Sequence, residues 1–324
     1  MQNKYPLGFF PSPLHALKNL SREFRDHQIY IKRDDQTGLA SGGNKTRKLE
    51  YIIREAIDQG CDTVITAGAQ QSNHCRQTAA ACNVARLECH LLVRGSDPGE
   101  YTGNLLLSKL LGAHIHYSGD DILPEDVENL CAQLREAGSR PYYTPIGGST
   151  LTGAMGFVEA ARELKEQLQA MNLHIDQVYF ASCSGGTQAG LVLGKALYGL
   201  EAELVPVSIE KPEMGEVSLE ASVLQIVNQG REALDLKQSF SLQDLKLLGG
   251  YDDAGYGVLT RNEKEAIQLL ARTEGILLDP VYSARAFFAM TDRLSKGLVK
   301  TGSNILFWHT GGLPANFHYG NDLL

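Results

Sequence analysis

The stretch Leu39–Tyr51, LASGGNKTRKLEY, predicts a glycine turn that leads directly into a helix. Gly42 and Gly43 shortly precede Lys45, and apolar residues then recur at helical spacing over 49–56. Glycine lets the backbone approach a ligand closely, and the N–H groups of a helix N-terminus favour a bound anion. The helix dipole and burial both disfavour a charged Lys45, so it can act as an amine nucleophile. An ordinary turn with solvated lysines fits the same residues.

Composition excludes several classes of protein. The chain has 324 residues, of which 43% are hydrophobic, enough for one large or two medium domains. The formal charge of −8 argues against a general nucleic-acid binder, which would present a basic face. The six cysteines form no C-x-x-C pair and no zinc spacing, so we expect reduced thiols and no metal site. We find no signal peptide or membrane span and expect a cytoplasmic protein.

Short apolar runs alternate with helical patterns along the chain. The runs that predict strands are 28–32, 63–67, 88–93, 114–117, 141–144, 177–181, 204–209 and 305–309. The patterns that predict helices are 14–24, 77–85, 105–111, 125–137, 158–171, 191–200, 217–234 and 262–273. Such alternation is typical of parallel sheets covered by helices. We therefore expect an α/β fold of two three-layer domains, with a small domain of residues 49–157 inserted into a large domain of residues 1–48 and 158–324.

A second glycine-rich stretch, Cys183–Gly190 (CSGGTQAG), lies between a predicted strand and a predicted helix. This arrangement can hold a phosphate with backbone N–H groups, helped by the hydroxyls of Ser184 and Thr187. The stretch matches neither a Walker loop nor G-x-G-x-x-G. A plain tight turn with glycines for packing is the alternative.

Three further segments also follow, or lie close after, predicted strands. In AGAQQSNHCR (67–76), Ser72 is placed to cap a helix, and its neighbours could face a carboxylate. Tyr256 and Tyr282 lie in glycine or proline contexts, where they could also be core aromatics. HTGG (309–312) ends the last predicted strand. Ligands of open α/β sheets bind at the carboxyl ends of strands, so this shared placement predicts one site.

Five motifs occur in order over nearly the whole chain: GGNKTRKLEY, QSNHCRQTAA, SGGTQAG, DPVYS and HTGG. Together they resemble the D-cysteine desulfhydrase and 1-aminocyclopropane-1-carboxylate (ACC) deaminase family. Its members are pyridoxal 5'-phosphate (PLP) enzymes of fold type II, the tryptophan synthase β-like fold. The resemblance implies a PLP-dependent lyase that acts on a small amino acid and forms a homodimer, without a nucleic-acid or membrane partner.

The resemblance also implies roles for individual residues. Lys45 would bind PLP covalently. The other residues implied to contact the cofactor are Lys48, Asn73, Ser184, Gly185, Gly186, Thr187 and Thr310. Within that set, Lys48 and residues 184–187 would hold the phosphate, Asn73 the ring hydroxyl and Thr310 the pyridine nitrogen.

Substrate contacts and catalysis are implied for a partly overlapping set. Ser72, Asn73 and His74 would hold the substrate carboxylate. Lys45 is the first candidate for the base that removes the α-proton, with Ser72 and Tyr282 as others, and Tyr256 would face the substrate.

Ser283 and Thr310 indicate which reaction of the family to expect. ACC deaminases tend to carry Glu and Leu at these positions, and SNQ where this chain has SNH at His74. A hydroxyl beside the pyridine nitrogen suits the loss of a good thiolate leaving group. We therefore predict that D-cysteine is converted to hydrogen sulfide, pyruvate and ammonia. ACC deamination and L-cysteate desulfonation are the alternatives within the family, and non-catalytic binding of PLP or an amino acid is the alternative outside it.

Overall fold

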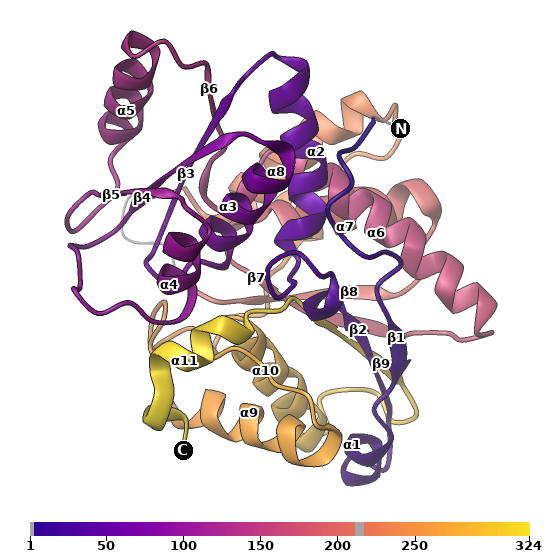
Figure 1. The fold of residues 1–324 in the computed structure, drawn as a ribbon. Coiled ribbons are helices and arrows are strands. Elements are labelled where there is room, and N and C mark those ends of the chain that lie inside the picture. Colours follow the sequence, from indigo (N-terminus) through magenta and orange to yellow (C-terminus); the bar gives the residue numbers. More distant parts are fainter. Residues whose placement is uncertain (1–2, 211–216) are drawn as a thin grey trace.

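The computed structural model describes residues 3–210 and 217–324, and these form two sheets flanked by helices (Figure 1). The five-stranded sheet has the order β1-β2-β9-β7-β8 and the four-stranded sheet the order β5-β4-β3-β6. The strands are β1 (Leu14–Ala16), β2 (Gln28–Arg33), β3 (Thr63–Gly68), β4 (Glu88–Val93), β5 (His114–Tyr117), β6 (Pro141–Tyr143), β7 (Gln177–Ser182), β8 (Glu203–Ser208) and β9 (Asn304–His309).

All pairings in both sheets are parallel except that of β1 with β2. The predicted α/β class with mostly parallel sheets is therefore confirmed. The strands of residues 49–157 all belong to the four-stranded sheet, which Figure 1 shows at the upper left beside α5. The domain boundaries themselves stay a prediction.

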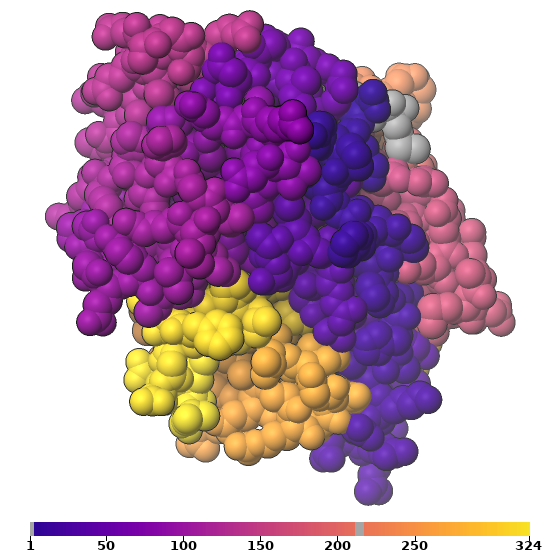
Figure 2. Space-filling model, viewed as in Figure 1, coloured from indigo at the N-terminus to yellow at the C-terminus, as the bar shows by residue number. Residues whose placement is uncertain are grey.

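Helices connect these strands and cover the sheets. They are α1 (Lys18–Glu23), α2 (Lys45–Asp58), α3 (Asn73–Ala85), α4 (Gly103–Leu110), α5 (Pro124–Glu136), α6 (Leu151–Ala170), α7 (Gly186–Tyr198), α8 (Leu219–Ala233), α9 (Arg261–Glu274), α10 (Ser283–Ser295) and α11 (Asn316–Tyr319). In the space-filling view, the C-terminal residues lie directly below the residues of the small sheet (Figure 2). There the Oγ1 of Thr102 and the Nδ1 of His318 are 2.9 Å apart, which ties α4 to α11.

Helices α2, α6 and α7 pack unusually closely because glycines face their neighbours. A Cβ atom on Gly156 would lie 2.2 Å from the carbonyl oxygen of Arg47, and one on Gly190 would lie 2.3 Å from that of Ala154. Since real Cβ atoms do not approach so closely, only glycine fits at both positions. This close packing fixes α2, which carries Lys45 at its first residue, against the body of the protein.

A buried ion network fixes α2 from a second side. The Nη2 of Arg47 lies 2.8 Å from Oδ1 of Asp34 and 2.8 Å from Oε1 of Glu163. The Nζ of Lys32 forms an ion pair with the same Oε1 of Glu163. These ions hold the pKa of Glu163 down at about 2 against the opposing effect of its burial. Because a buried charge is costly unless it is paired, the network joins β2, α2 and α6 in one arrangement.

The structure corrects the sequence expectations for three helices. Residues 14–24 do not form one helix, because Leu14–Ala16 pairs with β2 as strand β1 before α1 begins. Helix α10 (Ser283–Ser295) was not expected at all. Helix α6 starts at Leu151 rather than at residue 158. Among the described residues, no helix has the length and apolar character needed to cross a membrane.

Candidate active site

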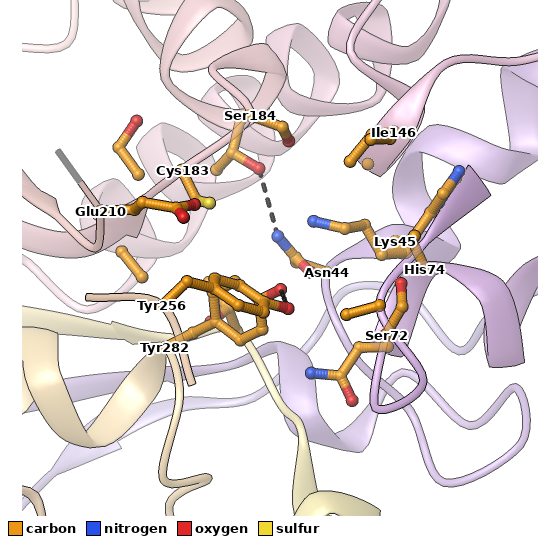
Figure 3. Close-up of a pocket in the computed structure, with 18 of the residues that line it drawn as sticks. Asn44, Lys45, Ser72, His74, Ile146, Cys183, Ser184, Glu210, Tyr256 and Tyr282 are labelled. Atoms are coloured by element: carbon orange, nitrogen blue, oxygen red, sulfur yellow. Dashed lines mark hydrogen bonds between the residues drawn. The ribbon is translucent and has the colours of Figure 1, made fainter. Parts of the chain in front are cut away.

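One cavity gathers the segments that follow the strands of both sheets (Figure 3). It measures about 990 Å³, including the space at its mouth that is open to solvent. Its lining includes ten of the twelve residues proposed from the sequence as site residues: Lys45, Ser72, Asn73, His74, Ser184, Gly185, Thr187, Tyr256, Tyr282 and Thr310. Lys48 and Gly186 do not line it and lie just behind its wall.

The glycine turn holds Lys45 at the first residue of α2. Gly42 and Gly43 have φ values of 69° and 131°, a region that favours glycine. A Cβ on Gly43 would also lie 2.2 Å from the side-chain nitrogen of Gln77. The backbone N–H of Asn44 donates to the carbonyl oxygen of Thr310 at 2.9 Å. The turn is therefore fixed to the end of β9, and Lys45 follows in a set position.

Burial makes the Lys45 amine a better nucleophile than an ordinary lysine. It lowers the pKa of Lys45 to about 8, although the nearby Cys183 and Asp279 act in the opposite direction. Lys48, one turn along α2, is fully enclosed and donates from Nζ to the carbonyl oxygen of Gly147 at 2.9 Å. Burial, followed by the charge of Lys45, lowers the pKa of Lys48 well below its ordinary value. Of these two lysines, Lys45 is the one that faces the cavity.

Two loops form a concave anion site beside Lys45. The first precedes α7, where Gly185 has a φ of 82° and exposes the helix N-terminus. The second contains Ser149, whose Oγ donates to Ser184 Oγ at 2.8 Å and accepts from the N–H of Gly186 at 3.2 Å. A Cβ on Gly186 would lie 2.9 Å from the Cα of Ser149 and 2.9 Å from the Nζ of Lys48, so this wall needs glycine and has the Lys48 amine behind it. Helix N-terminus, hydroxyls and lysine suit a phosphate group.

The Ser72–His74 segment starts α3 and confirms the predicted cap. Ser72 Oγ accepts from the backbone N–H of Cys75 at 3.2 Å. Asn73 Oδ1 accepts from Asn104 at 2.9 Å. The Nε2 of His74 lies 3.0 Å from Thr66 Oγ1, while its buried Nδ1 has no partner among the described residues.

Burial, then the charges of Lys45 and Lys48, lower the pKa of His74 well below its usual range. His74 is therefore neutral at pH 7. The start of α3 consequently offers N–H groups and a neutral ring to a bound carboxylate.

Two tyrosines share a hydrogen bond across the cavity from Lys45 (Figure 3). The hydroxyl oxygens of Tyr256 and Tyr282 are 2.5 Å apart, and their rings meet edge to face with centroids 5.8 Å apart. Burial raises the pKa of both phenols above the ordinary value, well above it for Tyr282. Both hydroxyls stay protonated at neutral pH and can donate a proton to a developing anion.

The two positions expected to decide the substrate lie in different surroundings. Thr310 lines the cavity at the end of β9. Ser283 is buried outside it, and its Oγ donates to the Asp279 carboxylate at 2.5 Å. That carboxylate also accepts the N–H of Ser283 at 2.7 Å. Ser283 therefore acts on the cavity only through the segment that carries Tyr282.

Several lining residues were missed by sequence reasoning. Asn44 Nδ2 donates to Thr187 Oγ1 at 3.1 Å and so links the lysine turn to the glycine loop. The loop at Gly147 and Gly148 carries a signal, since paired glycines precede the α6 cap at Thr150. Gly68, Ala69 and Cys183 also line the cavity and belong to the stretches 67–76 and 183–190 already predicted to face the site. The others are Arg94, Ile122, Ile146, Ala181, Ser182 and Glu210, for which isolated sequence positions give no such signal.

These residues fit a cofactor that carries both an aldehyde and a phosphate. Lys45 supplies a partly neutral amine, and the two glycine loops supply the anion site next to it. The buried Nδ1 of His74, which lies beside Lys45 in Figure 3, is a polar atom without a partner among the described residues, as is expected beside a site that receives a polar group. The set contains the functional groups that PLP and the carboxylate of an amino acid require.

Comparison with known proteins agrees with this chemistry. The model of the family "pyridoxal-phosphate dependent enzyme" matches residues 5–311. A D-cysteine desulfhydrase of Salmonella paratyphi A is 39% identical over 95% of this chain and 94% of its own. A putative ACC deaminase of Pyrococcus abyssi is 37% identical over 97% and 92%. The crystal structure of an ACC deaminase homologue has a TM-score of 0.90 at 35% identity, covering 99% of this chain and 95% of that one.

Proposed function

Because the chain belongs to the pyridoxal-phosphate dependent enzyme family, we propose that it removes the thiol group of D-cysteine and releases hydrogen sulfide, pyruvate and ammonia. Its cofactor, pyridoxal 5'-phosphate, when bound, withdraws electrons from the amino acid and so makes its α-proton acidic. The observation that carries the proposal is the placement of the partly neutral Lys45 amine opposite a protonated tyrosine pair.

Residues on both loops hold the cofactor in this proposal. Lys45 binds it covalently through Nζ. Ser184–Thr187 and the N-terminus of α7 would hold its phosphate, with the Nζ of Lys48 behind them. Asn73 orients the ring hydroxyl, and Thr310 offers a hydroxyl to the ring nitrogen. A hydroxyl at this position, unlike a carboxylate, would leave the ring nitrogen largely unprotonated.

Proton transfers are divided between the two sides of the cavity. Ser72, Asn73 and His74 fix the substrate carboxylate at the start of α3, which turns the α-carbon toward Lys45. The amino group of the substrate would displace Nζ of Lys45 from the cofactor, and the freed Lys45 amine would then accept the α-proton. The protonated hydroxyls of Tyr256 and Tyr282 donate to the departing thiolate as the carbon–sulfur bond breaks. Such general acid–base catalysis contributes roughly 10²–10⁴-fold in rate. Water would supply the keto oxygen of pyruvate as ammonia is released.

Two features favour D-cysteine over the other substrates of related enzymes. Thr310 and Ser283 stand where ACC deaminases tend to carry Leu and Glu, and ring opening of ACC demands more carbanion stabilisation than the loss of thiolate. Glu210 also lines the cavity beside Cys183, so its carboxylate repels the sulfonate of L-cysteate. The putative ACC deaminases of Pyrococcus make ACC the main competitor.

Parallel assays decide among these substrates. The purified holoenzyme is given D-cysteine, L-cysteine, ACC and L-cysteate, while pyruvate, 2-oxobutanoate, sulfide and sulfite are measured. We expect the highest kcat/KM with D-cysteine, with equal amounts of sulfide and pyruvate. A higher kcat/KM with ACC would refute the proposed substrate but retain the reaction class, whereas no product from any of them would refute catalysis.

We also propose a cytoplasmic homodimer divided into the two domains expected from the sequence. The six cysteines are all free thiols, which suits a reducing compartment. Light scattering after gel filtration should give twice the 35.4 kDa chain mass. Hydrogen exchange in which residues 49–157 open as one unit, separately from the rest of the chain, would support the domain boundaries.

A further inference from the structure

Strands β4 and β5 bring three histidines and a glutamate to one face of the small sheet. His90 is paired with His114, and His116 lies two residues further along β5. Side chains at alternate positions of a strand share a face, so Glu88, His90, His114 and His116 face the same way. The rings of His90 and His114 stack with centroids 4.5 Å apart and planes 20° apart. The cluster lies toward the amino ends of these strands, whereas Arg94, beyond the carboxyl end of β4, lines the active-site cavity.

His90 presents a buried nitrogen to this cluster without a hydrogen-bond partner. Its side chain is 9% exposed, and its Nδ1 lies 3.0 Å from the Nε2 of His116. Its Nε2 has no hydrogen-bond partner in the described part of the chain, and the nearby Oε2 of Glu88 is 3.9 Å away. Buried polar atoms are nearly always partnered, so an orphaned one needs an explanation.

The geometry comes close to that of a metal site. One ligand atom from each of Glu88, His90 and His114 lies within 4.8 Å of the other two. Ligands at zinc distances in a tetrahedron are about 3.4 Å apart, so binding requires the three to close in by about an ångström. Glu88 and His114 are exposed residues at the first position of their strands and can turn without moving the sheet. His90 stays fixed because His116 orients its ring, as partners of metal-bound histidines commonly do.

We infer that Glu88, His90 and His114 bind one divalent ion of the zinc type, with water completing its coordination. Two imidazoles and a carboxylate select Zn²⁺ and similar transition metals over Mg²⁺ and Ca²⁺, which take oxygen ligands. Cysteine spacings could not reveal such a site, because it has no cysteine ligand. Its ligands come from two strands that pair across the sheet, so they form no short motif.

Calorimetric titration of the holoenzyme with ZnCl₂ tests the inference. We expect one ion per chain for wild type, loss of this binding in His114→Ala and weaker binding in Glu88→Gln. His116→Phe, which removes only the orienting partner, should weaken binding roughly 10–100-fold. Because Glu88 and His114 are exposed, their variants should fold normally, which thermal melting verifies.

His174→Ala is the matched control. The Nε2 of His174 lies 3.4 Å from Oδ1 of Asp176, and its Nδ1 lies 3.9 Å from Oε2 of Glu201. This group therefore also combines an imidazole with carboxylates, but these three residues include only one histidine. The His174→Ala variant should bind zinc as wild type does. The inference is overturned if wild type binds no ion stoichiometrically, if either ligand variant binds as tightly as wild type, or if His174→Ala alone abolishes binding.

Discussion

Covalent capture of PLP by the cofactor-free protein should follow the titration of Lys45, because only a neutral amine attacks an aldehyde. Burial lowers the pKa of Lys45 to about 8. Roughly one Lys45 in ten is then neutral at pH 7, compared with about one in 3,000 for an ordinary lysine. The capture rate should rise about fivefold between pH 7 and 8 and less than twofold between pH 8 and 9, since rising pH deprotonates the amine until the pKa is passed.

Stopped-flow absorbance of the cofactor measures this rate across the pH range. Borohydride reduction and peptide mapping then identify the modified lysine. Lys45→Ala should carry no label, whereas wild type should carry it at Lys45 and not at Lys48, which is held behind the cavity wall by Gly147. A rate that keeps rising tenfold per pH unit through pH 9, or a label on Lys48, would refute this account.

Three further changes test other parts of the site and its support. Thr187→Val should weaken PLP retention during dialysis by roughly 10–150-fold, because a charge-assisted hydrogen bond worth about 1.5–3 kcal/mol is lost while the fold stays intact; retention equal to wild type would place the phosphate elsewhere. Thr310→Leu should lower kcat for pyruvate formation from D-cysteine and raise 2-oxobutanoate formation from ACC, which product assays compare directly. Glu163→Gln should cost about 3–5 kcal/mol in urea unfolding, because Lys32 loses its buried ionic partner. Since the pKa of Glu163 is about 2 when folded, wild type should lose that stability as pH falls from 4.5 toward 2, and the variant should not.

The structure also changes how the substrate hypothesis should be tested. A glutamate in place of Ser283 would stand against the buried carboxylate of Asp279, to which Ser283 Oγ now donates. Two carboxylates in contact would repel each other and disturb the Tyr282 segment. Thr310→Leu alone therefore isolates the chemical effect, because Thr310 lines the cavity itself.

Local patterns predicted most strands because each is a short apolar run bounded by turn residues. They predicted the site because glycine pairs and polar residues follow those strands. The missed helix α10 begins at Ser283, three residues after Pro280, and the carboxylate of the preceding Asp279 accepts the N–H groups of Val281, Tyr282 and Ser283. The start of α10 therefore depends on the side chain of Asp279, which bonds N–H groups two to four residues after it. Read locally, the same sequence resembles a turn.

Other features depend on distant residues and were beyond a local pattern. Strand β1 forms because β2 offers an edge to Leu14–Ala16, where the sequence alone suggested a helix. Glu210 enters the cavity beside Cys183 only because β7 and β8 lie side by side. The contacts that place them are tertiary, and no window of the sequence contains both partners.

The position of β9 constrains the order in which the protein can be completed during synthesis. β9 lies between β2 and β7, so the middle of the large sheet stays open until residue 309 has left the ribosome. The lysine turn is also unfinished until then, because its Asn44 N–H needs the carbonyl oxygen of Thr310. A nascent chain that stops before β9 therefore holds every residue of the glycine loops and both lysines, yet has no fixed place for a cofactor. Uptake of PLP thus reports that the chain has been made through its last strand.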